Sequence, residues 1–316
     1  MKPGYDKALY LLPFDHRQSY MTGMFDFKVP LSAHQHDQVS DSKQLIYEGF
    51  QLALVDGVPS ELAGILVDEE FGSDILRDAK RRGIVTALST ERSGIDEFDF
   101  EYGIDFARHI ETFDPTFAKV LVRYNPEGDA ALNLRQIDRL GRLSDYCRRT
   151  QRRFMFELLV PATERQLALA GNKAAYDKHT RPMLMDQIIR HLQDAGIEPD
   201  IWKIEGLDRR EDCERIVASA RRDGRNGVGC IVLGRGADEA MVRSWLETAA
   251  SVDGFIGFAV GRTSFWDAVA GYRAQTLTRA DAAAEISRRL RTWVAIFEEQ
   301  RVARANDADI ISGSMP

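Results

Sequence analysis

Two lysines lie inside apolar, strand-like runs of the sequence, where a charged side chain needs a reason. Lys203 stands between Trp202 and Ile204, and Lys119 stands within the apolar residues 117–122. Side chains alternate between the faces of a strand, so each lysine should point away from its large apolar neighbours. An unpaired buried ammonium is costly. Either internal ion pairs satisfy these lysines, or one is a nucleophilic amine activated by an apolar pocket and a second cation.

A glutamate closes the strand-like run that precedes the one containing Lys203. Glu157 follows the apolar residues 154–156, and Glu205 lies two positions beyond Lys203 on the same expected face. Either carboxylate is able to form an ion pair with Lys203. Glu157 is also placed to take a proton from a substrate hydroxyl while a carbon–carbon bond breaks. The residue pattern leaves the ion-pair and the catalytic interpretations open.

Two further strand-like runs each end in glycine and arginine and then enter a helix. The first reads Leu-Gly-Arg-Gly-Ala over 233–237, and the second reads Val-Gly-Arg-Thr-Ser over 260–264. Glycine lets backbone N–H groups approach an anion, a helix start favours negative charge, and arginine binds phosphate with two parallel hydrogen bonds. The turns predict a phosphate site formed by Gly234, Arg235, Gly236, Gly261 and Arg262.

Three more arginines, Arg17, Arg92 and Arg123, follow or end strand-like runs. Because arginine matches the geometry of a carboxylate, one of them is expected to bind an acidic group of the substrate. We favour Arg123, since alternation places it on the same face as Lys119, with Arg17 as the second choice. A surface ion pair with a neighbouring acid is the alternative for each arginine.

Other ionisable residues receive a structural interpretation. Glu69, Glu70 and Glu91 follow strand-like runs, and we attribute them to a solvated rim where charges cost little. His34 and His36 offer two metal ligands without a third nearby, so we expect a solvated loop and no metal site.

The elements that must position these residues alternate regularly along the chain. Apolar runs predict strands at 8–14, 64–67, 84–88, 117–122, 153–159, 201–204, 229–233 and 255–260. Apolar residues at three- and four-residue spacing predict helices at 42–55, 133–150, 182–195, 210–222, 238–250 and 280–299. Helical crossovers between strands require parallel pairing.

Eight such strands predict a closed (β/α)8 barrel, an α/β fold, as one domain over residues 1–305. The competing open, doubly wound sheet usually has a glycine-rich loop after its first strand, whereas residues 13–17 read Pro-Phe-Asp-His-Arg. In a barrel of this kind, the chemistry lies at the carboxyl ends of the strands, where the residues above are expected. We predict a long loop at 18–40, which is either a lid over the site or a simple connection. We also predict a flexible tail at 306–316.

Composition excludes several classes of protein. The 316 residues are 44% hydrophobic with a net charge of −7, which argues against a nucleic-acid partner. Three scattered cysteines, Cys147, Cys213 and Cys230, are too few for a disulfide framework or a cysteine-based zinc site. No apolar stretch approaches the roughly 20 residues needed to cross a bilayer. We therefore expect a cytoplasmic protein without a membrane partner.

The chain resembles the bacterial 2-deoxy-5-keto-gluconate 6-phosphate aldolase-like family of myo-inositol breakdown, a domain often fused behind the matching sugar-acid kinase. The resemblance covers nearly the whole chain. It rests on Pro-Phe-Asp-His-Arg-Gln at 13–18, Lys-Val-Leu-Val-Arg-Tyr-Asn-Pro at 119–126, Phe-Glu-Leu-Leu-Val-Pro at 156–161, Trp-Lys-Ile-Glu-Gly at 202–206, Leu-Gly-Arg-Gly-Ala at 233–237 and Phe-Ala-Val-Gly-Arg-Thr-Ser-Phe at 258–265.

More distantly, the strand ends are similar to those of class I tagatose 1,6-bisphosphate and sulfofructose phosphate aldolases. This similarity implies that Lys203 forms the Schiff base and that Glu157 handles protons. It also implies that Lys119, Asp15 and Arg262 complete the site. The chain departs from these relatives after the aspartate, where they carry an uncharged polar residue in place of the following histidine.

The resemblance implies cleavage of a phosphorylated keto sugar acid to dihydroxyacetone phosphate and malonic semialdehyde. It implies no cofactor or metal, because the protonated imine is the electron sink. The expected partners are a small phosphorylated sugar or sugar acid and further copies of the chain in a homo-oligomer. The alternatives are a class I aldolase acting on a ketose phosphate, and a barrel that binds a sugar phosphate without turning it over.

Overall fold

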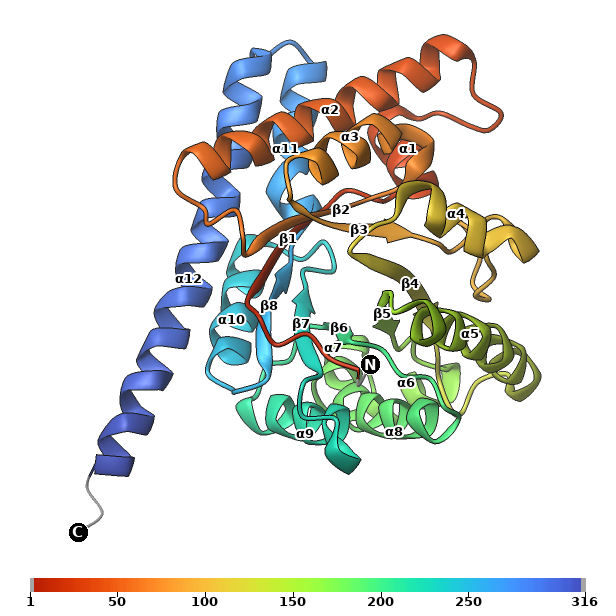
Figure 1. The fold of residues 1–316 in the computed structure, drawn as a ribbon, viewed down its shortest axis with the longest axis vertical. Coiled ribbons are helices and arrows are strands. Elements are labelled where there is room, and N and C mark those ends of the chain that lie inside the picture. Colours follow the sequence, from red (N-terminus) through yellow and green to blue (C-terminus); the bar gives the residue numbers. More distant parts are fainter. Residues whose placement is uncertain (1–2, 314–316) are drawn as a thin grey trace.

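Eight parallel strands close into a barrel, which confirms the predicted (β/α)8 architecture (Figure 1). The computed structural model describes the backbone of residues 3–313 and the side chains of residues 3–306. Each strand is hydrogen-bonded to the next one along the chain, and the last returns to the first. The strands are β1 (Leu9–Pro13), β2 (Ala63–Val67), β3 (Val85–Ser89), β4 (Phe117–Arg123), β5 (Arg153–Leu159), β6 (Ile201–Glu205), β7 (Gly229–Leu233) and β8 (Phe255–Ala259).

Helices connect the strands and surround the barrel (Figure 1). They are α1 (Gln18–Phe25), α2 (Ala33–Val55), α3 (Glu69–Arg81), α4 (Phe106–Phe113), α5 (Ala130–Thr150), α6 (Glu164–Ala170), α7 (Lys173–Ala175), α8 (Arg181–Asp194), α9 (Arg210–Ala220), α10 (Glu239–Ala250), α11 (Arg262–Arg273) and α12 (Arg279–Gly313). Shorter helical segments lie at η1 (Gly103–Asp105), η2 (Tyr176–Thr180) and η3 (Arg222–Gly224).

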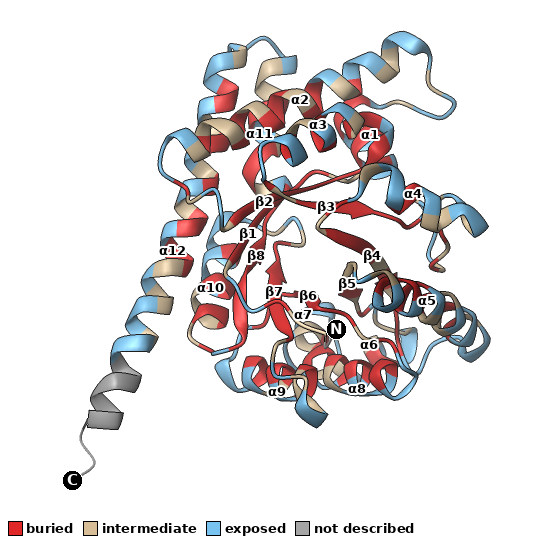
Figure 2. Ribbon diagram, viewed as in Figure 1, coloured by how far each residue is buried: buried red, intermediate tan, exposed pale blue. Residues whose placement is uncertain are grey.

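The apolar core has an inner and an outer layer, separated by the strands, which are buried almost throughout (Figure 2). Phe117, Met155 and Ile201 belong to the inner cluster, which fills the barrel near the start of the strands. Trp202 and Ile204 belong to the outer cluster between the barrel and the helices. Alternation therefore leaves the next inward positions, toward the carboxyl ends, for polar side chains.

The strand register sets the height of the buried polar side chains. Glu157 on β5 is paired with Lys203 on β6, so these two inward side chains are lateral neighbours. Lys119 on β4 is paired with Met155 on one side and Ser89 on the other. The Lys119 side chain therefore begins one layer deeper in the barrel than those of Glu157 and Lys203.

The segment 18–40, expected as a long loop, is largely helical. Helix α1 follows β1 closely, and α2 begins at Ala33, well before the predicted start at residue 42. A capping box fixes this start: the Ser32 side chain accepts a hydrogen bond from the Gln35 N–H, and the Gln35 side chain accepts one from the Ser32 N–H. At the other end, α12 continues through Gly313, so residues 306–313 of the expected tail are helical, and residues 314–316 lie outside the described residues.

Candidate active site

A cavity of about 650 Å³ opens at the carboxyl ends of the strands. Its lining includes residues from widely separated parts of the chain, among them Asp15 after β1, Glu157 on β5, Lys203 on β6 and Arg262 after β8. The barrel thus brings together the side chains that the sequence analysis placed at strand ends. Lys119 lies beneath them and contacts three residues of this lining.

Lys119 is the centre of a buried cluster of carboxylates. Its Nζ lies 2.8 Å from Asp15 Oδ2, 2.7 Å from Glu91 Oε1 and 2.8 Å from Glu157 Oε2. Burial alone would lower the pKa of Lys119, but the three carboxylates outweigh it and hold that pKa well above its ordinary value. Lys119 is therefore a fixed cation at the base of the cavity.

Lys203 has a different environment from Lys119. Its side chain is 4% exposed, and among the residues with described side chains its Nζ forms one ion pair, with Glu157 Oε2 at 2.9 Å. The alternative partner, Glu205, instead contacts Arg235 Nε at 2.9 Å and accepts a hydrogen bond from the Val160 N–H at 3.0 Å. Because a single carboxylate contacts Lys203 whereas three contact Lys119, the Lys203 amine is less tightly held and is the better placed of the two to attack a substrate.

The carboxylates of the cluster differ in how readily they bind a proton. Burial raises the pKa of Glu157, but Lys119 and Lys203 reverse this and hold it below its ordinary value. Lys119 likewise holds the pKa of the buried Asp15 carboxyl below its usual range. The pKa of Glu91 is raised, because burial and the nearby charge of Asp15 outweigh its contact with Lys119. The environment therefore favours the ionised forms of Asp15 and Glu157 and makes Glu91 the carboxylate of the three that binds a proton most readily.

Glu91 belongs to the cluster, although the sequence analysis attributed it to a solvated rim. It is buried, and it forms an antiparallel bridge with Phe100 just beyond β3. A signal was available: Ser89 and Glu91 are two residues apart and share one face of an extended chain. Ser89 was also missed; its Oγ donates a hydrogen bond to Asp15 Oδ2 at 2.7 Å.

The two Gly-Arg turns meet at one side of the cavity. Arg262 is the first residue of α11, and its guanidinium lies directly over Gly236, where an added Cβ would come within 2.8 Å of it. Gly261 packs so closely on β1 that a Cβ would lie 2.3 Å from the Pro13 carbonyl oxygen. Gly234, Arg235 and Gly236 line the cavity with them.

The two arginines of these turns differ in how many contacts they make with other protein groups. Arg235 adopts a left-handed backbone conformation, with φ of 52°, and its guanidinium is paired with Glu205 at 2.9 Å and Asp177 at 3.2 Å. Arg262 donates one long hydrogen bond, 3.3 Å, to the Arg235 carbonyl oxygen, and no ion pair to it occurs among the described residues. Arg262 therefore offers the less committed charge for an anionic ligand.

The arginines considered for a substrate carboxylate also differ. Arg17 is buried; it donates to Glu101 Oε2 at 2.8 Å and to the Glu91 carbonyl oxygen. Arg123 lies 3.6 Å from the exposed Asp96 and donates to the Ile95 carbonyl oxygen at 3.3 Å. Arg123 and Arg92 both line the cavity. The Arg17 guanidinium is thus occupied by protein acceptors, while those of Arg123 and Arg92 are more available to a substrate carboxylate.

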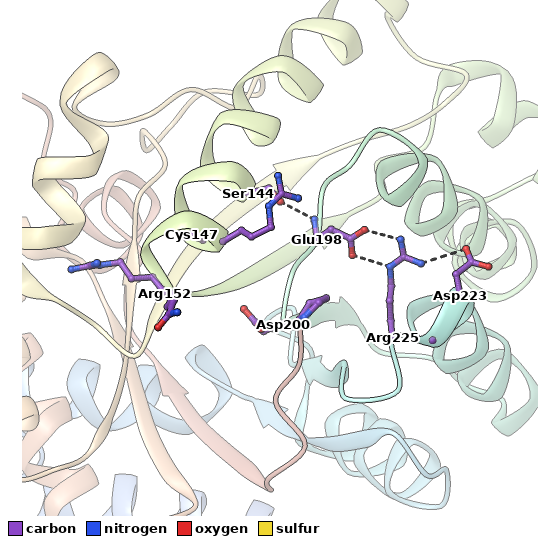
Figure 3. Close-up of a pocket in the computed structure, with 11 residues that line it drawn as sticks. Ser144, Cys147, Arg152, Glu198, Asp200, Asp223 and Arg225 are labelled. Atoms are coloured by element: carbon purple, nitrogen blue, oxygen red, sulfur yellow. Dashed lines mark hydrogen bonds and ion pairs between the residues drawn. The ribbon is translucent and has the colours of Figure 1, made fainter. Parts of the chain in front are cut away.

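A second cavity, of about 370 Å³, opens where the strands begin (Figure 3). Asp200, directly before β6, accepts hydrogen bonds from the backbone N–H groups of Gly4 and Phe154, both at 2.7 Å. Arg225 donates two hydrogen bonds to Glu198, at 2.8 and 2.7 Å (Figure 3). These charged groups are hydrogen-bonded to one another and to the backbone. This cavity is therefore a weaker candidate for an active site than the one at the carboxyl ends of the strands.

The two histidines considered as metal ligands lie on a helix and not in a loop. His34 and His36 fall in the first turns of α2, where His36 packs on Phe71 with ring centroids 4.8 Å apart. Among the residues that the structure describes, no group of three or more His, Cys, Asp or Glu could hold a metal ion. Among all the described residues, no helix is long and apolar enough to cross a membrane.

Several solved structures share this fold. A protein from Corynebacterium glutamicum has a TM-score of 0.55 and 18% identity, over 92% of this chain and 88% of that one. An archaeal fructose 1,6-bisphosphate aldolase has a TM-score of 0.55 and 12% identity, over 90% of this chain and 94% of that one. A fructose-bisphosphate aldolase from Slackia heliotrinireducens has a TM-score of 0.53 and 12% identity, over 88% and 85% of the two chains. At these identities the similarity establishes the fold.

The profile of a protein family described as "Uncharacterized protein conserved in bacteria (DUF2090)" matches residues 2–301. The match spans all eight strands and the cavity at their carboxyl ends. No curated protein matches the chain.

Proposed function

The chain belongs to the bacterial family DUF2090, and we propose that it is a class I aldolase in which Lys203 forms a Schiff base with a phosphorylated keto sugar acid. One observation carries this proposal: the cavity contains a buried lysine with one carboxylate neighbour, beside a second lysine held by three. Binding a sugar phosphate requires neither feature. A nucleophilic amine next to a fixed cation and a proton-transfer group requires both.

The proposed reaction begins with attack of the neutral Lys203 amine on the substrate ketone. Uptake of one proton and loss of water then give a protonated imine, which accepts the electron pair of the breaking carbon–carbon bond and becomes an enamine. Glu157 lies 2.9 Å from Lys203 Nζ, so it can carry protons to and from that nitrogen and is one candidate base for the substrate hydroxyl. The enamine is then protonated and hydrolysed. For 2-deoxy-5-keto-gluconate 6-phosphate, the products are dihydroxyacetone phosphate and malonic semialdehyde.

A direct test is reduction with borohydride in the presence of dihydroxyacetone phosphate. The wild-type protein should gain the mass of a reduced imine, and digestion followed by mass spectrometry should place the adduct on Lys203. A protein that binds dihydroxyacetone phosphate without forming any adduct would instead be a non-catalytic sugar-phosphate-binding barrel.

We predict that Arg262→Ala weakens binding of the phosphate group. A hydrogen bond to a charged group is worth about 1.5–3 kcal/mol, so KM for a phosphorylated substrate should rise about ten- to a hundredfold. Steady-state kinetics with phosphorylated and dephosphorylated forms of one substrate provide the measurement. If the variant loses both forms equally, Arg262 does not bind the phosphate.

We predict that Arg123→Ala selectively impairs a substrate with a carboxylate. The comparison is kcat/KM for the keto sugar acid phosphate against a neutral ketose phosphate, and the acid should lose about 1–3 kcal/mol more of transition-state stabilisation. Arg92→Ala tests the other available cation in the same assay. Arg17→Ala should impair both substrates, because Arg17 supports Glu101 and the Glu91 carbonyl group. A wild-type preference for the neutral ketose would favour the ketose phosphate aldolase instead.

A further inference from the structure

His16 lines the cavity beside the buried cluster but forms no hydrogen bond with a described residue. Its Nδ1 is buried and lies 4.0 Å from Asp15 Oδ1, about 1 Å beyond hydrogen-bonding distance. The side chain as a whole is 31% exposed. Because Nδ1 faces the protein while the ring lines the cavity, Nε2 is the nitrogen that is open to a bound substrate.

The surroundings of His16 keep its ring neutral. Burial lowers its pKa to about 4, and the positive charges of Arg262 and Lys203 act in the same direction, against Asp15 and Glu157. A neutral imidazole carries one N–H and one lone pair. With the N–H on the nitrogen that faces Asp15, the lone pair of Nε2 points toward the cavity. A neutral ring with an open lone pair is able to accept a proton.

We propose that His16 is a further catalytic residue, whose Nε2 accepts the proton of the substrate hydroxyl as the carbon–carbon bond breaks. This inference rests on the proposed aldolase function. The hydroxyl proton moves to Nε2, and the O–H electron pair forms the new carbonyl bond of the aldehyde. The electrons of the carbon–carbon bond move to the protonated imine, which becomes a neutral enamine. The imidazolium then returns the proton to the enamine carbon, which restores neutral His16 and the protonated imine.

His16 is better placed for this step than Glu157. Glu157 Oε2 is shared by the two ammonium groups of Lys119 and Lys203, at 2.8 and 2.9 Å, which weakens it as a base and holds it at the amine. The charge at Lys203 weakens His16 as well, but that charge disappears when the protonated imine becomes an enamine. The proton affinity of His16 therefore rises during the step in which it accepts the proton, and Asp15 stabilises the imidazolium.

The test separates the aldol step from imine formation. In His16→Gln, we expect the borohydride-trapped adduct of dihydroxyacetone phosphate on Lys203 to form as in the wild type. Cleavage of the keto sugar acid phosphate should fall by about 10²- to 10⁴-fold in kcat. Glu157→Gln should instead slow formation of the adduct itself. His34→Gln, the same substitution at an exposed position outside the cavity, should change neither measurement.

Three outcomes would overturn the role of His16, and they differ from failure of the proposed function. If the His16→Gln variant cleaves the substrate at the wild-type rate, another base accepts the proton. Equal losses of adduct and cleavage in this variant show that His16 acts in binding or in folding of the site. A slow aldol step in Glu157→Gln with normal adduct formation returns the role to Glu157. If the wild-type protein forms no adduct at all, the aldolase proposal itself fails.

Discussion

Replacing Lys203 with methionine should abolish the covalent adduct with dihydroxyacetone phosphate and reduce kcat for cleavage by about 10⁴- to 10⁶-fold, as expected when a nucleophile is removed. Methionine keeps a long, unbranched side chain in the buried position but has no amine. Glu157 loses one of its two ammonium partners and keeps Lys119 at 2.8 Å, so the variant should still fold.

Lys119→Arg is the matched control for this experiment. It keeps a positive charge among the carboxylates and leaves Lys203 intact, so the adduct should still form on Lys203. Mass spectrometry of digested, borohydride-treated protein locates the modified lysine in each case. An adduct on Lys119 in the wild-type protein, retained in Lys203→Met, would reverse the roles assigned to the two lysines.

Lys119→Met should be the most destabilising of the substitutions considered. It leaves Asp15, Glu91 and Glu157 close together without their shared cation, and an uncompensated buried charge costs about 3–5 kcal/mol. The free energy of unfolding at pH 7, from urea denaturation, should fall by this amount. Lys203→Met removes a single ion pair and should cost less, because Glu157 keeps its other partner.

Lys119→Met should gain stability between pH 7 and pH 5, a range in which Asp15 and Glu157 leave the stability of the wild-type protein nearly unchanged. In the wild-type protein the folded-state pKa values of Asp15 and Glu157 are lowered, so their contribution is present above about pH 4, the unfolded-state value, and is lost as pH falls further. Without Lys119, burial should raise these pKa values. The variant should then regain stability as pH falls from 7 toward 5. If the free energy of unfolding of the variant and that of the wild type changed with pH in the same way across this range, the proposed charge cluster would be contradicted.

The barrel could be predicted from the sequence because each strand is a short, largely apolar run, separated from the next by a helical segment. The helix starts were harder. The first turns of α2 carry His34, His36 and other polar residues on all sides, so no apolar stripe reveals them. The signal that was present is local: Ser32 and Gln35 have the spacing of a capping box. Helix α1 has no side-chain cap at Arg17, so it lacked even that signal.

The candidate site could be predicted where alternation along one strand sufficed, as for Lys203, Glu157 and Lys119. It could not be predicted where the decisive contact joins distant segments. The spacing from Ser89 indicates the face on which Glu91 lies, but no local pattern shows that its carboxylate contacts Lys119 at 2.7 Å. The commitment of Arg17 to Glu101 is hidden for the same reason, since 84 residues separate the two.

The position of Arg262 over Gly236 bears on how substrate length could be tuned. A methyl group at residue 236 would lie 2.8 Å from the guanidinium carbon, and the backbone there has φ of +69°, which glycine adopts without strain. The absence of a side chain at residue 236 therefore leaves room for the Arg262 guanidinium, which we propose binds the substrate phosphate, and so affects its distance from Lys203. Under the proposed function, a substitution at residue 236 should shift the phosphate-binding guanidinium, so designs that change the accepted substrate length can begin there without altering a charged residue.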